Sequence, residues 1–201
     1  MENYNRDEMY KRTVNIYMEA NPNPNSLKFV ANYMLVPAGE SYDFPDAASA
    51  EKAPLAQELF KMDHIERVFY MSNFVTVTKG DGADWAEIQD SIRKFITEYL
   101  QAEKPLLLEE DSAEPDQVEN TVDEPELEKK IKEILDEYIK PAVEMDGGAI
   151  QFHSFEDGVV KLLLQGACSG CPSSTVTLKA GIENLLKRMV PEVQTVEAEG
   201  I

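Results

Sequence analysis

The sequence predicts an α+β protein of two small domains joined by an acidic flexible linker. In both halves of the chain, apolar residues change from alternate spacing to a spacing of three or four, which indicates strands followed by a helix. Residues 101–125 break this periodicity and carry nine acids, one base and three prolines. A self-repelling segment of that composition is typical of a disordered linker, and structureless loops of that length are uncommon within compact domains. The predicted division is an N-terminal domain at 1–100, a linker at 101–125 and a C-terminal domain at 126–201.

The N-terminal domain is expected to begin with two strands around a proline-rich turn. Alternating apolar residues predict strands at 14–18 and 27–31, while each proline of 21–25 disfavours helix at the residue before it. A short helix is expected at 54–62, and Ser72-Asn73 indicates a hairpin between two further strands. Asp84, with Glu87 three residues later, predicts the start of the last helix through a capping box. The expected buried face of that helix consists of Trp85, Ile88, Ile92, Phe95 and Tyr99.

The C-terminal domain is expected to begin with a helix that ends near Pro141. The apolar stripe of this helix is Leu127, Ile131, Ile134 and Tyr138. A turn at 146–148 then leads to a hairpin of 149–155 and 159–165, whose second strand is apolar enough to be buried. A helix follows the cysteines, and a short strand passes through Val193 and Val196. The stripe of that second helix is Leu178, Ile182, Leu185 and Met189.

Composition limits the function classes. With 43% hydrophobic residues the chain can bury a core, and two cysteines are too few for a secreted disulfide framework. The first residues carry acids and no apolar segment, which disfavours a signal or transit peptide, and no apolar run reaches the ~18 residues of a membrane span. We therefore expect a cytoplasmic protein with no membrane association. A net charge of −19 also makes nucleic acid an unfavourable partner.

The two cysteines, Cys168 and Cys171, have C-x-x-C spacing, which places both sulfurs within reach of one metal centre or of each other. Pro172 suits the first turn of the following helix, so Cys171 is expected at or beside its N-cap. Free backbone N–H groups and the helix dipole favour thiolates there. A zinc site or an iron–sulfur cluster takes about four protein ligands. A metal held by this pair therefore needs two more ligands, most simply from a second copy of the chain.

The spacing alone leaves three functions open: an iron–sulfur carrier, a thioredoxin-like thiol–disulfide oxidoreductase, and a zinc site shared across a dimer. The oxidoreductase is disfavoured because the proline follows the pair and no sequence feature marks a partner loop with a cis-proline. The shared zinc site is disfavoured because it gives no function to the linker or to the N-terminal domain. His64 and His153 belong to no motif and are expected to pack or to lie on the surface. No catalytic triad, phosphate loop or paired catalytic carboxylates is visible.

Residues 127–197 resemble the NifU C-terminal domain of Nfu-type iron–sulfur carriers. The matching stretches are Met145-Asp146-Gly147-Gly148, the run from Leu164 to Ser174 that contains both cysteines, Thr177 to Glu183, and Pro191-Glu192-Val193. Residues 14–99 are similar to the Nfu N-terminal domain, through 23–29 and 75–79. One departure is Ala149, where family members often have an acid, and we expect it to be a surface detail.

The resemblance implies a scaffold or carrier, not an enzyme. Its cluster, [4Fe–4S] in preference to [2Fe–2S], would bridge two protomers in a homodimer through Cys168 and Cys171 of each. The implied partners are upstream cluster assembly proteins as donors and apo iron–sulfur proteins as recipients.

Overall fold

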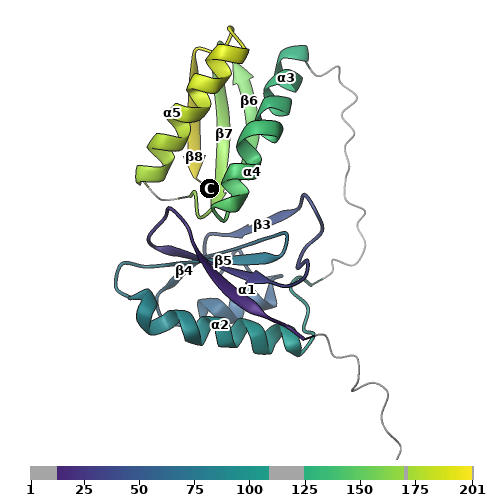
Figure 1. The fold of residues 1–201 in the computed structure, drawn as a ribbon, viewed down its shortest axis with the longest axis vertical. Coiled ribbons are helices and arrows are strands. Elements are labelled where there is room, and N and C mark those ends of the chain that lie inside the picture. The colour runs from purple at the N-terminus through teal and green to yellow at the C-terminus, as the bar shows by residue number, and fades with distance from the viewer. Residues whose placement is uncertain (1–12, 109–124, 170–171, 201) are drawn as a thin grey trace, which may run out of the picture.

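The computed structural model describes residues 13–108, 125–169 and 172–200, and of residues 172–175 the backbone alone. Two α+β domains, each with its own sheet and hydrophobic core, make up these residues, which confirms the predicted fold class (Figure 1). Most of the predicted linker, residues 109–124, lies outside the described residues. The domain boundaries given above therefore stay predictions.

The N-terminal domain is a five-stranded antiparallel sheet with two helices on one face (Figure 1). The strand order is β1-β2-β5-β4-β3. Its elements are β1 (Ile16–Ala20), β2 (Ser26–Ala31), β3 (Ser41–Phe44), α1 (Pro54–Phe60), β4 (Ile65–Met71), β5 (Phe74–Lys79) and α2 (Trp85–Gln101). The side chain of Asp84 accepts a hydrogen bond of 2.9 Å from the backbone N–H of Ala86, so α2 begins where the sequence predicts. Edge strand β3 was not predicted, because its alternation of polar and apolar residues extends over only four residues.

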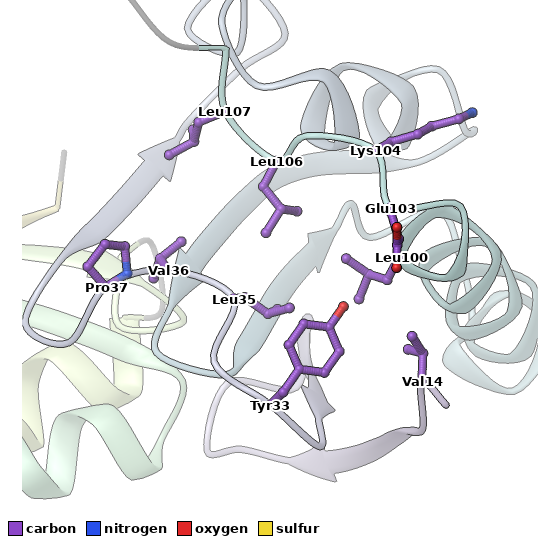
Figure 2. A pocket seen from close by; sticks show the side chains of 10 residues that line it. All are labelled: Val14, Tyr33, Leu35, Val36, Pro37, Leu100, Glu103, Lys104, Leu106 and Leu107. Atoms are coloured by element: carbon purple, nitrogen blue, oxygen red, sulfur yellow. The ribbon is translucent and has the colours of Figure 1, made fainter. Parts of the chain in front are cut away.

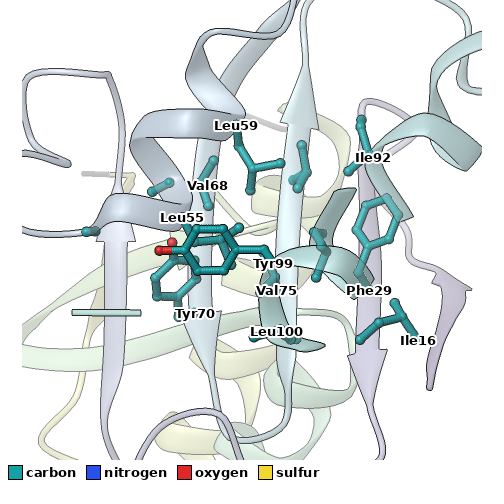
Figure 3. Close-up of a cluster of buried hydrophobic side chains, with 14 of the residues drawn as sticks. Ile16, Phe29, Leu55, Leu59, Val68, Tyr70, Val75, Ile92, Tyr99 and Leu100 are labelled. Carbon is teal, nitrogen blue, oxygen red and sulfur yellow. The ribbon is translucent and has the colours of Figure 1, made fainter. Parts of the chain in front are cut away.

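The N-terminal core lies between the helices and the sheet (Figure 3). Leu55, Leu59 and Ile92 from the helices meet Phe29 and Val75 from the strands, and all five side chains are at most 1% exposed. Leu106 and Leu107, beyond the end of α2, pack against the same core. A cavity of about 510 Å³ opens beside them (Figure 2). None of its lining residues is a cysteine or belongs to the C-terminal domain, so it is not the candidate site.

The C-terminal domain has a three-stranded sheet of order β6-β7-β8. Its elements are α3 (Glu126–Ile134), the π-helical segment η2 (Leu135–Ile139), α4 (Lys140–Met145), β6 (Gly148–Glu156), β7 (Val159–Gly166), α5 (Pro172–Met189) and β8 (Thr195–Gly200). Strands β6 and β7 form the predicted antiparallel hairpin, and β8 pairs parallel with β7 after the α5 crossover. The two cysteines therefore lie in the connection between the end of β7 and the start of α5.

The prediction that the first helix of this domain ends near Pro141 is wrong. Helical structure continues through η2 and α4 to Met145, and Pro141 lies at the start of α4, directly after the π-helical turn. The π-helical turn also shifts the apolar stripe, because it places more residues in one turn than an α-helix does. Leu135 is consequently 2% exposed, whereas Tyr138 is 49% exposed and lies off the predicted stripe.

The second face of the N-terminal sheet is covered by the C-terminal domain, on the side opposite α1 and α2 (Figure 1). We call this the docking face; its residues alternate with those of the N-terminal core. The docking face consists of Lys28, Val30, Ser41, Asp43, Phe69, Met71, Phe74 and Thr76. Its four apolar members form a buried cluster with Ala149 of β6. The expectation that Ala149 is a surface detail is therefore wrong, because the side chain is 7% exposed within this contact between domains.

Candidate functional site

Cys168 lies in the turn after β7 and is 6% exposed. It packs against the hydrophobic core of the C-terminal domain. Helix α5 begins at Pro172, as predicted, so the C-x-x-C segment precedes the N-terminus of an 18-residue helix. Cys171 lies outside the described residues. Its role as a ligand, like that of Cys168, stays a prediction.

Glycines shape the turn that carries Cys168. Gly166 has a φ of +63°, which an L-residue with a side chain adopts only at a cost. The next residue, Ala167, donates its N–H to the carbonyl of Gly147 at 3.2 Å. A Cβ at Gly148 would lie 2.9 Å from the Cys168 Sγ, so the missing side chain leaves room for the sulfur. Gly148, which the sequence predicts to lie in a turn, thus also borders the thiol.

Side chains of the N-terminal domain donate hydrogen bonds to three backbone carbonyls around this turn. The amide of Asn23 donates to the carbonyl of Ala167 at 2.9 Å, beside Cys168 in the sequence. The Thr76 hydroxyl donates to the carbonyl of Gly147 at 2.8 Å, and the Lys28 ammonium to that of Met145 at 3.2 Å. Asn23, Thr76 and Lys28 are 5%, 1% and 8% exposed, so these polar groups are buried and satisfied by the other domain.

Asp43 makes a further polar contact between the two domains. Its Oδ2 accepts a hydrogen bond from the Gly166 N–H at 3.3 Å and pairs with Arg67 Nη1 at 2.6 Å. The side chain is 4% exposed. Burial raises the pKa of the Asp43 carboxyl to about 6, because it outweighs the opposing effects of Arg67 and the Gly166 N–H.

Sequence reasoning missed Asn23, Lys28, Asp43 and Thr76 as parts of the site. They occupy polar positions of a turn or of strands with alternating character, and such positions normally face water. A sequence signal did exist for Asn23, Lys28 and Thr76, which lie within the two stretches shared with the Nfu N-terminal domain. Nothing in those stretches indicated that they contact the cysteine turn.

A cavity of about 420 Å³ lies beside the thiol, between the two domains. It is lined by Pro22, Asn23, Asp146, Ala167, Cys168, Thr177 and Leu178. Burial raises the pKa of the Asp146 carboxyl, although nearby Lys28 opposes the shift. The described residues contain no group of three or more His, Cys, Asp or Glu side chains able to hold a metal. A metal or cluster at Cys168 therefore needs ligands from outside the described residues.

The histidines take no part in this site. His64 and His153 are both exposed, and neither lines the cavity at Cys168. Within the described ranges, no helix combines the length and the apolar character needed to cross a bilayer.

Comparison with known proteins assigns each half of the chain to a domain family. Residues 16–103 match the family model described as scaffold protein Nfu/NifU N terminal, and residues 131–197 match the NifU-like domain. NifU-like proteins 4 and 5 of Arabidopsis thaliana, both named mitochondrial, are each 43% identical over 191 residues. These alignments cover 94% of this chain and 67% and 69% of the two relatives. The chain belongs to the NifU-like protein family.

Two further similar proteins, one of them a solved structure, illustrate how much of each chain is shared. A protein of Drosophila willistoni named NFU1 iron-sulfur cluster scaffold homolog, mitochondrial, is 42% identical over 190 residues. The chain spans about 65% of the length of that protein. The solution structure of a NifU-like protein from Saccharomyces cerevisiae matches with a TM-score of 0.45 at 25% identity, covering 50% of this chain and 90% of that one.

The expected cytoplasmic location is wrong in the light of these NifU-like relatives, which are named mitochondrial. The expectation depended on a low cysteine count and on the character of the first residues. A low cysteine count does not distinguish one reducing compartment from another.

Proposed function

We propose that this NifU-like chain is an iron–sulfur cluster scaffold or carrier. It binds a cluster, [4Fe–4S] in preference to [2Fe–2S], through Cys168 and Cys171 and transfers the cluster intact to apo-proteins. The observation that carries the proposal is the position of Cys168, in a glycine-shaped turn before α5, with its sulfur beside a cavity of about 420 Å³. The family assignment supports the same conclusion.

The site favours thiolates and supplies too few of them. The N-terminus of α5 carries the positive end of the helix dipole, and it follows the C-x-x-C segment directly. Two cysteines in the whole chain leave a four-thiolate cluster two ligands short. A cluster bridged between two protomers supplies the missing pair and makes a homodimer of the loaded form.

The small number of cysteine ligands in each chain also favours transfer of the cluster. Each exchange breaks one iron–sulfur bond to this chain and forms one to a client thiolate. The released cysteine takes up the proton that the client thiol lost, and no electrons change hands. A carrier of this kind needs only to hold, orient and release its cargo, so we propose no enzymatic step.

Anaerobic reconstitution with iron and sulfide tests the proposal. We expect a charge-transfer absorbance in the visible spectrum, about one cluster per two chains, and a shift from monomer to dimer in light scattering. A monomer that carries a complete cluster would refute the bridged arrangement. Protein that takes up zinc but no iron and sulfide would refute the carrier function.

A further inference from the structure

We propose that Asn23 of the N-terminal domain is a positioning residue for cluster binding, because its amide holds the peptide that precedes Cys168. This inference rests on the proposed function, since it assigns the cluster to Cys168. It gives the N-terminal domain a share in the site itself.

The side chain of Asn23 is held in one orientation by its own turn. Its Oδ1 accepts the N–H of Asn25 at 3.0 Å, while its backbone N–H donates to the side chain of Asn21 at 3.1 Å. The same Asn21 oxygen accepts the hydroxyl of Ser26 at 2.8 Å. These bonds are typical of Asx turns, in which short side chains replace backbone partners. The Asn23 Nδ2 is thereby directed at the Ala167 carbonyl before any cluster binds.

Both backbone polar groups of Ala167 are held by hydrogen bonds. Its N–H donates to Gly147 within the C-terminal domain, and its carbonyl accepts from Asn23 across the domain contact. The peptide between Ala167 and Cys168 therefore cannot rotate without losing the bond to Asn23. Since that peptide sets the direction of the Cys168 Cα–Cβ bond, rotation would also move the sulfur. Holding a ligand through supporting hydrogen bonds of this kind is a general requirement of precise metal sites.

Two neighbouring contacts support the same turn from the docking face. Thr76 donates to the Gly147 carbonyl, which also accepts the Ala167 N–H, and Asp43 accepts the N–H of Gly166. Of these three side chains, Asn23 alone lines the cavity at Cys168. Asn23 therefore borders the space that a cluster would enter. Thr76 and Asp43 instead contact Gly147 and Gly166, which precede Ala167 in the sequence.

The decisive variant is Asn23→Asp in the full chain. The carboxylate keeps the acceptor for the Asn25 N–H and the size of the side chain, but it removes the donor to Ala167. Asn32→Asp is the matched control, because Asn32 makes the same pair of bonds elsewhere in the domain. Its Oδ1 accepts the Asn15 N–H at 3.0 Å, and its Nδ2 donates to the Thr13 carbonyl at 3.0 Å.

Two readouts separate positioning from general stability. The first is the rate at which iodoacetamide alkylates Cys168 in the apo-protein, measured in a Cys171→Ser background. The second is the rate of cluster loss to a chelator from the reconstituted protein with both cysteines. We expect Asn23→Asp to raise both rates about three- to tenfold, as the loss of one hydrogen bond implies. Because Asn23 is buried and Asn32 is exposed, the new carboxylate should also lower the melting temperature of Asn23→Asp, so both rates are measured well below its melting transition.

Equal alkylation rates in Asn23→Asp and Asn32→Asp would overturn the proposal, as would faster alkylation with unchanged cluster loss.

If Asn23→Asp does not fold, Thr76→Val tests the same turn and should also raise the rates of alkylation and of cluster loss. Thr78→Val is its control, because the buried Thr78 hydroxyl has no hydrogen-bond partner among the described residues. Wild-type protein that binds no cluster would refute the proposed function, while the alkylation rates would still show whether Asn23 holds the turn.

Discussion

The substitution Gly166→Ala probes the cysteine turn and the domain contact together. Gly166 has a φ of +63°, and an added Cβ would lie 2.8 Å from both the Gly147 carbonyl oxygen and the ring of Phe69. Neither neighbour can move freely. The Gly147 carbonyl accepts the Ala167 N–H and the Thr76 hydroxyl, and Phe69 is fully buried in the docking face.

Two terms set the expected destabilisation by Gly166→Ala. Left-handed backbone in a residue with a side chain costs roughly 1–2 kcal/mol. Overpacking a closed site adds about 1–3 kcal/mol. The free energy of unfolding should therefore fall by roughly 2–5 kcal/mol, a large part of the ~5–15 kcal/mol that a typical protein has.

Gly39→Ala is the control that separates these two terms. Gly39 has a φ of +87°, but no atom lies within 4 Å of the position that its Cβ would occupy. The backbone penalty and the reduced freedom of the unfolded chain are thus shared by both variants. Urea unfolding followed by circular dichroism should show Gly166→Ala to be less stable than Gly39→Ala by about 1–3 kcal/mol.

A double-mutant cycle with Phe69→Ala tests whether the domains dock as described. Removing the ring should relieve one of the two close contacts, so Gly166→Ala should cost at least ~1 kcal/mol less in that background. An unchanged cost would show that Phe69 does not touch the turn in solution. Equal stability of Gly166→Ala and Gly39→Ala would refute the packing argument as a whole.

Three further predictions concern the cysteines and two carboxylates. Cys168→Ala or Cys171→Ala should abolish cluster retention, because each leaves a bridged cluster two ligands short. The circular dichroism spectrum should stay unchanged. Normal iron content in either variant would contradict the ligand assignment. Asp43 has a raised pKa of about 6 against an ordinary 3.8, so the folded protein binds the additional proton and its stability should fall as pH rises from about 4 to 6. Urea unfolding of Asp43→Asn and wild type should differ in this pH dependence by up to about 3 kcal/mol, at 1.36 kcal/mol per pKa unit, and parallel curves would contradict the burial argument. The pKa of Glu183 is lowered to about 2 by Lys187 and by the Val196 N–H, so its stabilising effect should be present above pH 4.5 and lost as pH falls toward 2. Acid unfolding of Glu183→Gln should lack that component; identical acid profiles would show that the contact between α5 and β8 is weak.

Local patterns in the sequence predicted most of the elements. Asp84 identified the start of α2, Ser72-Asn73 the hairpin of β4 and β5, and Pro172 the start of α5, because caps, turns and first-turn prolines act over a few residues. Edge strand β3 escaped prediction because its pairing with β4 comes from tertiary structure. The π-helical turn of η2 escaped it because its residues have ordinary helical character.

The cysteine turn could be predicted, but its surroundings could not. The C-x-x-C spacing and the following proline are local features, and they placed Cys168 beside a helix N-terminus. Thr76 and Lys28 alternate with buried apolar residues, which is the pattern of a strand with one face in water. Only the three-dimensional structure shows that this face meets the backbone of a second domain.

The contact between the domains is chemically one-sided, and this should determine which substitutions it tolerates. The N-terminal domain contributes side chains, whereas the C-terminal domain contributes mostly main-chain groups, namely the carbonyls of residues 145, 147 and 167 and the N–H of residue 166. Every amino acid except proline provides these groups. In a saturation mutagenesis scan, the N-terminal positions should therefore be selective for chemical identity. The facing C-terminal positions should accept changes of chemical character and exclude added volume, above all at the glycines. Related chains could then vary one partner widely while the other stays nearly fixed, and pairwise covariation between the domains would be weak even though they touch.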